Sequence, residues 1–479
     1  MATTLDDIAQ AIRGFIASEA QVPEGDPAFT LDIHLYEAGY LDSIRLVSLM
    51  AFIASRLRVE LDDSALFSEQ FTTIRGIASL VYAAARAGDA PAKTAAPQGD
   101  PPIRALARSD LPAVARLYEF VERSQTRNAP LGLEDYFRRI LLDQPHADPA
   151  LPSLVFEENG NIEGFLGVHV RRLRLKDRPI RAACVGQLVV EPRARPKAVG
   201  LKLLETFLAG AQDLSLTDGA THDVLAMWEA LGGRARAVGN LRWTRVLRPW
   251  RFAAGLLARR DGALGRGLAL LGSPFATVAD GVTRTVTGTR FRSSAPATAL
   301  REQELTPEAL VRRVEASGAP SLRPAYDAEY LRWLFHELGE VRSRGTLRRV
   351  LLLDAGTPAG WYVYQLKRGG VAHVLQVGVI SSAEAVLAHL FRDAERAGAV
   401  AIQGRGEPRL LPTLDRMGVG LDYASSYAVA HTKDPEIAAA LHSGDALLTR
   451  LDGEWWTGFQ QEPHHAAPAP PPALATAAS

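Results

Sequence analysis

A serine near the N-terminus stands where a phosphate ester could be held. In the stretch EAGYLDSIRLVSLMAFI, residues 37–53, Ser43 directly follows Asp42 at the front of an apolar run. Aspartate is a good helix N-cap and the apolar residues recur at roughly helical spacing, so Ser43 is predicted to lie in the first turn of a helix. The free backbone N–H groups of a first turn attract phosphate. Ser43 is therefore a candidate for covalent modification, and a merely polar first-turn residue is the alternative.

A second candidate for anion binding lies in the stretch LVVEPRARPKAVGLKLLETFLAGA, residues 188–211. The pattern changes there from strand to helix, and Arg195, Ala198 and Gly200 follow the spacing R-x-x-A-x-G. Small residues let backbone N–H groups approach a ligand closely, and the start of the next helix favours phosphate. The loop is predicted to hold the phosphate of a pantetheine ligand, with an ordinary strand-to-helix turn as the alternative. Its predicted cofactor-binding residues are Val190, Arg195, Lys197, Ala198, Val199 and Gly200.

The elements around Ser43 are predicted to form a small helical bundle over residues 1–86. Thr4 and Asp7 suit a capping box. Apolar stripes at helical spacing are formed by Leu5, Ile8, Ile12 and Phe15 and by Ile74, Ile77 and Val81. With the Asp-Ser pair, this region resembles the acyl and peptidyl carrier protein family, on the residues Gly39, Leu41, Asp42, Ser43, Ile44, Val47 and Leu49. The resemblance implies a four-helix carrier bundle, a phosphoprotein with phosphopantetheine covalently bound to Ser43, and a phosphopantetheinyl transferase as partner.

Residues 87–102 are rich in Ala, Pro and Gly and are predicted to be a flexible linker. Residues 103–255 then show a strand, a capped helix and a series of strands that leads to the R-x-x-A-x-G loop. This order resembles the GCN5-related N-acyltransferase (GNAT) family, and the match is carried by Val190, Pro192, Arg195, Ala198 and Gly200. Ala198 replaces the first glycine of the family signature. The resemblance implies a mixed α/β catalytic domain that binds a pantetheine thioester.

The chemistry of that family requires a polarised thioester carbonyl, a deprotonated amine and an acid for the leaving thiolate. The resemblance implies that a backbone amide within residues 187–190 polarises the carbonyl. Trp228 stands where many family members have a tyrosine, and an indole does not act as an acid at neutral pH. The candidates for catalytic proton transfer are His222, Asp223 and His169, each with a structural role as the alternative. The single cysteine, Cys184, is interpreted as a buried apolar residue.

The second half of the chain repeats the first faintly. Gly356 and Gly360 repeat the spacing of Gly160 and Gly164, and strand and helix patterns follow in the same order. The loop equivalent to the anion site reads ISSAEAVLAHL, with Glu384 and with neither glycine nor base. Residues 301–460 are therefore predicted to be a second GNAT-like domain without catalysis. Residues 256–300 are predicted to connect the halves, and residues 461–479 to be a disordered tail. The aromatic side chains of Tyr330, Trp333, Trp455 and Trp456 are interpreted as core residues, with a substrate cleft as the alternative.

Composition narrows the classes of partner. Lys plus Arg and Asp plus Glu both number 54 in 479 residues, so the net charge gives no indication of a nucleic-acid partner. One cysteine excludes an intrachain disulfide and a multi-cysteine metal site, and no metal is expected. The N-terminus carries acids where a secretory signal carries bases, and no apolar stretch reaches the ~18 residues of a membrane span. A cytoplasmic protein without an integral membrane segment is predicted.

Together these patterns predict an α+β multidomain chain, with a carrier bundle, a linker and two tandem GNAT-like mixed α/β domains. The predicted activity is that of an N-acyltransferase, which moves an acyl group other than an aminoacyl group from a phosphopantetheine thioester to a small-molecule amine. An acyl-loading ligase or synthase is a further expected partner, and coenzyme A or acyl-CoA a further candidate cofactor. One alternative is a coenzyme-A-dependent N-acetyltransferase whose carrier holds the acceptor. Another is a non-catalytic module that delivers an acyl chain to a partner synthase.

Overall fold

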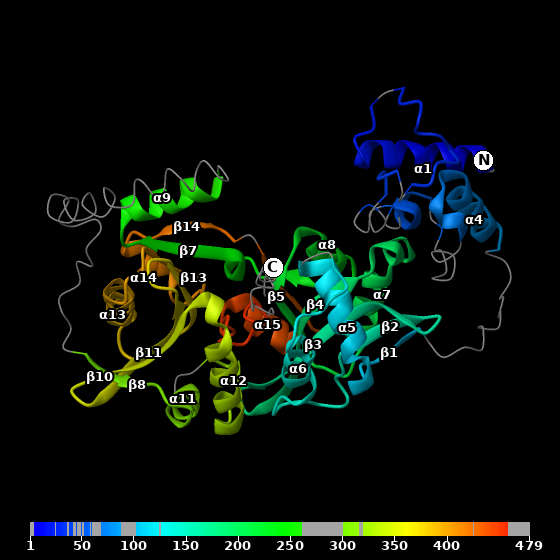
Figure 1. The fold of residues 1–479 in the computed structure, drawn as a ribbon. Coiled ribbons are helices and arrows are strands. Elements are labelled where there is room, and N and C mark those ends of the chain that lie inside the picture. The colour runs from blue at the N-terminus through cyan, green and yellow to red at the C-terminus, as the bar shows by residue number, and fades with distance from the viewer. Residues whose placement is uncertain are drawn as a thin grey trace, which may run out of the picture.

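The computed structural model describes the chain from residue 4 to residue 457 with several gaps (Figure 1). The gaps are positions 24, 36–37, 42–44, 46–48, 50–51, 58, 60–68, 88–101, 124–125, 261–299, 316–319 and 425. The predicted modification site Ser43, with Asp42 and Ile44, therefore lies outside the described residues. So do almost all of the predicted linker and all of the predicted tail.

The N-terminal region is helical, as the sequence predicted. Its described elements are the helices α1 (Leu5–Glu19) and α4 (Ile74–Ala87), a π-helical turn η1 (Ile53–Leu57) and a 3-10 turn η2 (Glu69–Thr72). The capping box forms, because the Asp7 amide donates to Thr4 Oγ1 at 3.2 Å and the Thr4 amide donates to Asp7 Oδ2 at 2.9 Å. The two predicted apolar stripes meet in one core, in which Ile12, Ile74 and Ile77 are fully buried.

The first sheet has the strand order β1-β2-β3-β4-β5-β15-β6, and β9 pairs with the far end of β3. Its strands are β1 (Ile103–Ala105), β2 (Leu154–Glu158), β3 (Asn161–Leu175), β4 (Arg178–Val190), β5 (Leu214–Ala220), β6 (Arg234–Ala235), β9 (Leu322–Pro324) and β15 (Tyr427–His431). β2 and β3 form a hairpin whose turn residues Asn159 and Gly160 both have positive φ, as a type I′ turn requires.

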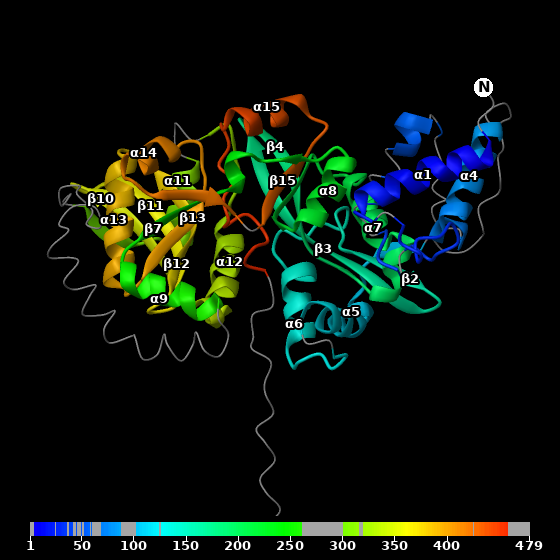
Figure 2. The same cartoon turned by 90° about the horizontal axis from the view of Figure 1, so that it is seen from above.

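Helices cover both faces of this sheet (Figure 2). They are α5 (Leu111–Tyr118) and α6 (Leu133–Phe137) on one face and α7 (Val199–Leu208) and α8 (His222–Ala230) on the other, with the short turns η3 (Arg108–Asp110), η4 (Glu119–Arg123), η5 (Arg138–Leu142) and η6 (Pro192–Lys197). Successive side chains of a strand point to opposite faces of the sheet, which accounts for a helix layer on each face. Val155 and Phe165 pack with α5 and α6, whereas their neighbours Phe156 and Leu166 pack with α7 and α8.

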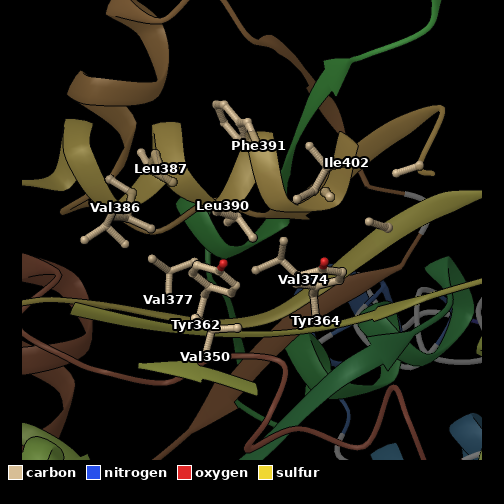
Figure 3. Packing of buried hydrophobic residues seen from close by; sticks show 14 of the residues in the cluster. Val350, Tyr362, Tyr364, Val374, Val377, Val386, Leu387, Leu390, Phe391 and Ile402 are labelled. Carbon is tan, nitrogen blue, oxygen red and sulfur yellow. The ribbon is translucent and has the colours of Figure 1, made fainter. Parts of the chain in front are cut away.

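The second sheet has the order β14-β7-β13-β12-β11-β10-β8. Its strands are β7 (Leu241–Val246), β8 (Arg301–Glu304), β10 (Thr346–Asp354), β11 (Thr357–Leu366), β12 (Val371–Val379), β13 (Ala401–Arg405) and β14 (Gly420–Tyr423). The other elements of this half are α9 (Pro249–Arg260), α11 (Pro307–Val314), α12 (Ala328–Glu340), α13 (Ala383–Arg396), α14 (Leu411–Arg416), α15 (Pro435–Ser443), η7 (Val238–Asn240) and η8 (Arg342–Arg344). Figure 3 shows α13 packed on one face of the sheet, with Leu387 and Leu390 above Tyr362 and Val377.

The second half repeats the strand and helix order of the first. Gly164 on β3 lies under α7, where an added Cβ would come within 2.5 Å of Val199 Cγ1. Gly360 on β11 lies under α13, where an added Cβ would come within 2.5 Å of Val386 Cγ2. Each glycine therefore allows the same close approach of helix to sheet. This shared contact supports the repeat that the glycine spacing predicted.

Each sheet is completed by a strand from the other half of the sequence. β7, which precedes the described start of the second half, pairs with β13 and β14. β15, which follows β14, pairs with β5 and β6 in the first sheet. The predicted boundaries 103–255 and 301–460 place β7 in the first unit and β15 in the second, so the two sheets do not divide along those boundaries.

A C-terminal segment, residues 446–457, passes between the two sheets (Figure 1). The buried Arg171 of β3 holds it, because its Nε donates to the Asp452 carbonyl at 2.9 Å and its Nη2 to the Gly453 carbonyl at 3.3 Å. On the side of the second sheet, the Leu451 amide donates to the Leu375 carbonyl of β12 at 3.1 Å. The segment therefore contacts both halves. None of the helices in the described part of the chain has both the length and the apolar character that crossing a membrane would require.

Candidate functional site

The central strands of the first sheet separate beyond a short paired stretch. β4 and β5 run parallel and pair from Ala182 to Cys184, opposite Leu214–Leu216. Beyond Cys184 the described residues of the two strands form no further pairs. On its other edge β4 changes register against β3, and Gln187 has a φ of 52°, the geometry of a β-bulge. A wedge-shaped opening between β4 and β5, which we call the splay, therefore begins beside a bulge.

Gln187 is fixed at the bulge by its side chain. Its Nε2 donates to the Thr457 carbonyl at 3.1 Å and to Thr457 Oγ1 at 3.0 Å, and its Oε1 lies 3.1 Å from His169 Nε2. Positive φ is strained for a residue other than glycine, so these contacts stabilise a conformation that the chain alone disfavours. The bulge falls inside residues 187–190, where the sequence predicted a backbone amide that polarises a carbonyl. That role stays a prediction.

The loop between β4 and α7 leaves the helix start without a side-chain cap. Ala198 occupies the N-cap position with φ 54° and ψ 31°, and its methyl group accepts no hydrogen bond. A left-handed conformation is one that glycine adopts most readily, so Ala198 holds a backbone geometry that is uncommon for its type. An added Cβ at Gly200 would lie 3.5 Å from Val190 Cγ2, which is ordinary contact. Since a helix start offers free N–H groups and a partial positive charge, the loop suits a phosphate.

The two bases of the loop have different surroundings. Arg195 is exposed, and within the described part of the chain no carboxylate lies at ion-pair distance from it. Lys197 contacts Glu158 and lies 3.5 Å from Glu163, and the hydrogen bond to Glu158 raises its pKa. The charge of Lys197 is therefore already compensated. Arg195 acts electrostatically on Glu122 without an ion pair, so of the two predicted bases it has the less compensated charge.

The helical N-terminal region lies against this same loop. Ala198 is buried as a member of the core cluster of that region, and Leu201 packs on the cluster from α7. Figure 2 shows α1 and α4 beside α7 and α8, and Figure 1 agrees from a second direction. The bundle therefore contacts the chain where the predicted phosphate site begins.

The three predicted catalytic residues occupy two different environments. His169 is fully buried, and this burial, with the nearby Arg171, lowers its pKa to about 3. His222 and Asp223 are exposed in the first turn of α8, which is capped by Thr221. Among the described residues, no hydrogen bond, ion pair or ring contact joins His169 to either of them. Their catalytic roles stay predictions.

The aromatic and cysteine side chains near the site have structural surroundings. Trp228 is fully buried beside Phe207. Cys184 is fully buried, and its burial raises the pKa of the thiol well above its usual range, so it is not a thiolate nucleophile. Trp456 is also buried, whereas Trp455 lies under the guanidinium groups of Arg344 and Arg450, 3.4 and 4.0 Å from its ring centre.

A carboxyl group that the sequence analysis missed lies at the base of the splay. Glu454 of the C-terminal segment fills the space beside Gly186 on β4 and Gly219 on β5. Its Oε1 accepts from the Gly219 amide at 2.7 Å, and its Oε2 accepts from the Asp218 amide at 2.8 Å and from Cys184 Sγ at 3.0 Å. No local pattern could have indicated Glu454, because it follows β5 by more than two hundred residues.

The surroundings of the Glu454 carboxyl group change its pKa. Burial raises its pKa well above the usual range, and the nearby carboxyl group of Asp218 adds to the rise. Asp218 Oδ1 accepts from the amides of Glu454 and Trp455, both at 2.9 Å. Two carboxyl groups thus lie together where β4 and β5 part. The carboxyl group of Glu454, with its raised pKa, is therefore a candidate for proton transfer.

Comparison with known proteins agrees with the carrier prediction. Residues 10–81 match the family described as "Phosphopantetheine attachment site". The N-terminal region is a phosphopantetheine attachment domain. This domain requires a phosphopantetheinyl transferase for its activation, and the sequence-based prediction of a carrier region is confirmed. A search of curated proteins found no match.

Solved structures resemble the rest of the chain. A probable N-acyltransferase from Enterococcus faecalis has 10% identity and a TM-score of 0.45, over 69% of this chain and 72% of that one. A GCN5-related N-acetyltransferase from Anabaena variabilis has 10% identity and a TM-score of 0.46, over 70% and 73%. One from Kribbella flavida has 17% identity and a TM-score of 0.42, over 71% and 72%. The α+β multidomain class and the mixed sheet and helix domains agree with the sequence-based prediction.

Proposed function

We propose that this chain is an N-acyltransferase that uses its own carrier domain as the acyl donor. The acyl group, other than an aminoacyl group, is held as a thioester on the phosphopantetheine arm of Ser43 and passes to an amine at the splay of the first sheet. The observation that carries the proposal is the burial of Ala198 in the carrier core, at an uncapped helix start. The domain that bears the arm thus abuts the loop suited to the phosphate of that arm.

Transfer forms a C–N bond and breaks the C–S bond of the thioester. The amine attacks the carbonyl carbon, the bulge at Gln187 supplies backbone N–H groups toward the developing oxyanion, and the arm leaves as a thiolate that takes up a proton. The Arg195 guanidinium and the start of α7 bind the phosphate of the arm. The predicted linker of about fifteen residues keeps the arm at a millimolar effective concentration.

Glu454 is the group that we assign to proton transfer. The attacking amine loses a proton, and a histidine with a pKa of about 3, such as His169, is a weak base for it. Glu454 lies between β4 and β5, and its raised pKa makes its carboxylate a stronger base than that of an ordinary glutamate.

Intact-protein mass spectrometry tests the proposal. A phosphopantetheinyl transferase with an acyl-CoA would load the acyl arm onto Ser43, and addition of amines should then remove the acyl mass from the protein. The Ser43→Ala variant should gain no mass. If Ser43→Ala still acylates amines from free acyl-CoA, the chain is a coenzyme-A-dependent transferase instead. If the loaded arm keeps its acyl group with every amine, the chain is a delivery module.

Three further expectations belong to this proposal. An acyl-loading ligase or synthase supplies the acyl group in the cell, and a small-molecule amine receives it. Coenzyme A serves as the source of the arm during modification of Ser43. A cytoplasmic location stays a prediction.

A further inference from the structure

A cavity lies between the two halves, at the ends of β5 and β13. The space inside it that a water-sized group can enter is about 30 Å³. It is lined by residues of both halves and of the C-terminal segment: Asp218, Arg236, Gly239, Trp243, Val374, Leu375, Val377, Arg405, Gly406, Glu407, Ala428, Leu448, Thr449 and Arg450. The cavity thus exists only because the two halves and the segment come together.

Three arginines of this lining have few partners for their charge. Arg405 donates to the carbonyls of Gly239 and Asp218 at 3.0 and 2.9 Å, but its Nε has no acceptor among the described residues. The Nε of Arg450 is also buried without an acceptor there. No described carboxylate lies at ion-pair distance from Arg236, Arg405 or Arg450. Arg405 also donates to Ser426 Oγ at 2.7 Å, so the donors left for a ligand include the Nε groups of Arg405 and Arg450.

The lining of the cavity has more cationic than acidic side chains. Burial lowers the pKa of Arg236 and Arg405, and burial together with the charge of Arg405 lowers that of Arg450 to about 9. Two acids of the lining, Asp218 and Glu407, oppose the three cations, and burial raises the pKa of Glu407 to about 7. Glu407 is thus only partly ionised at neutral pH. From outside the lining, Asp452 acts on Arg236 and Glu454 acts on Arg405. Like charges gathered in a poorly hydrated space are costly unless an anion joins them.

We propose that this cavity binds the carboxylate or phosphate group of the acceptor amine. The cationic lining favours a negatively charged group. The guanidinium group of arginine can donate two parallel hydrogen bonds to a carboxylate or to a phosphate. That the bound anion belongs to the acceptor rests on the proposed acyl transfer. That the cavity binds an anion rests on the cavity alone. Asp218 joins the two places, because it lines the cavity while its backbone amide donates to Glu454 at the splay. An acceptor anchored by its anion therefore has its amine directed toward the splay.

Thermal unfolding with inorganic phosphate tests the anion site directly. At constant ionic strength set with chloride, phosphate should raise the melting temperature of the full chain, and Arg236→Gln and Arg450→Gln should each remove most of the rise. Arg234→Gln is the matched control, since Arg234 is exposed and does not line the cavity. Its response should equal that of the wild type. An equal response in all four proteins would overturn the anion site, whatever the activity of the enzyme.

A pair of acceptors tests the link to transfer. With the loaded full chain, an amino acid should be a better acceptor than its uncharged amide. Arg236→Gln should raise the KM for the amino acid by roughly tenfold or more, as the loss of one charge-assisted contact predicts, with little change for the amide. Equal KM values in wild type and variant would exclude the cavity as the acceptor site. If the two arginine variants lose the phosphate effect but the wild type transfers no acyl group, the anion site stands and the proposed function is contradicted.

Discussion

The two halves of the molecule contain the same strand-to-helix junction in two chemical settings. In the first half, α7 begins at Ala198 without a side-chain cap and with the exposed Arg195 close by. In the second half, Ser382 caps α13 by accepting from the Ala385 amide at 3.2 Å, and Glu384 adds a negative charge in the first turn. One helix start is open to an anion, whereas the other is already satisfied and repels one.

The contrast extends to the strands before each helix. Gln187 and Gln376 stand at equivalent places, three residues before the partners of Gly164 and Gly360. The C-terminal segment binds both glutamines through threonines: Thr457 accepts from Gln187, and Thr449 Oγ1 accepts from Gln376 Nε2 at 3.3 Å. The same segment also places the Glu454 carboxyl group at the splay of the first sheet, beside Gly186 and Gly219. The C-terminal segment thus contacts both halves in a similar way, whereas the candidate groups for catalysis lie at the first sheet.

Removal of the second half should have the largest effect. A chain that ends at residue 255 lacks β15 and the C-terminal segment, so it exposes the edge of β5 and leaves β7 without its partners β13 and β14. Unpaired edges and exposed apolar faces favour aggregation. We expect no soluble folded protein, measured by size-exclusion chromatography and circular dichroism. A chain that ends at residue 460 is the control and should stay folded, and a soluble, active 1–255 fragment would show that the halves are independent.

Replacement of Glu454 should have the next largest effect. Glu454→Gln keeps the shape of the side chain but cannot accept a proton, so single-turnover transfer should slow by about 10² to 10⁴-fold. In the wild type the rate should rise with pH through the raised pKa of Glu454, because the ionised form accepts the proton, and the variant should lose this rise. Glu337→Gln is the control, since Glu337 is buried in an ion pair with Arg139. Identical pH profiles in wild type and Glu454→Gln would refute the assignment.

Local signals in the sequence located part of this site and missed the rest. The Asn159 and Gly160 turn, the capping box and the R-x-x-A-x-G loop depend on neighbouring residues, and each is visible in a short window. The exchange of β7 and β15 is different, because an apolar strand has the same alternation whichever sheet it joins. Glu454 reached the splay through that exchange, so no spacing could connect it to β4 and β5.

Charge reversal at the open helix start should have a smaller effect. Arg195→Glu places a carboxylate beside the phosphate of the arm, and we expect transfer from the carrier to weaken by roughly 10 to 100-fold. The melting temperature should hardly change, because Arg195 is exposed. The matched variant in the other half, Glu384→Arg, should leave transfer unchanged. A large loss of stability in Arg195→Glu would mean that the loop arginine is structural, and equal turnover that the loop is an ordinary turn.

Removal of the cap in the second half should have the smallest effect. Ser382→Ala leaves the Ala385 amide without its acceptor, which should lower the free energy of unfolding by about 1 kcal/mol. The neighbour Ser381→Ala removes only a 3.4 Å contact to the Ala359 carbonyl and should cost less. Denaturant unfolding measures both, and transfer by the folded proteins should be unaffected, because the closed helix start has a structural role in this comparison. If Ser382→Ala instead slowed transfer or created binding of a pantetheine probe at α13, the two helix starts would not differ in the way that their caps indicate.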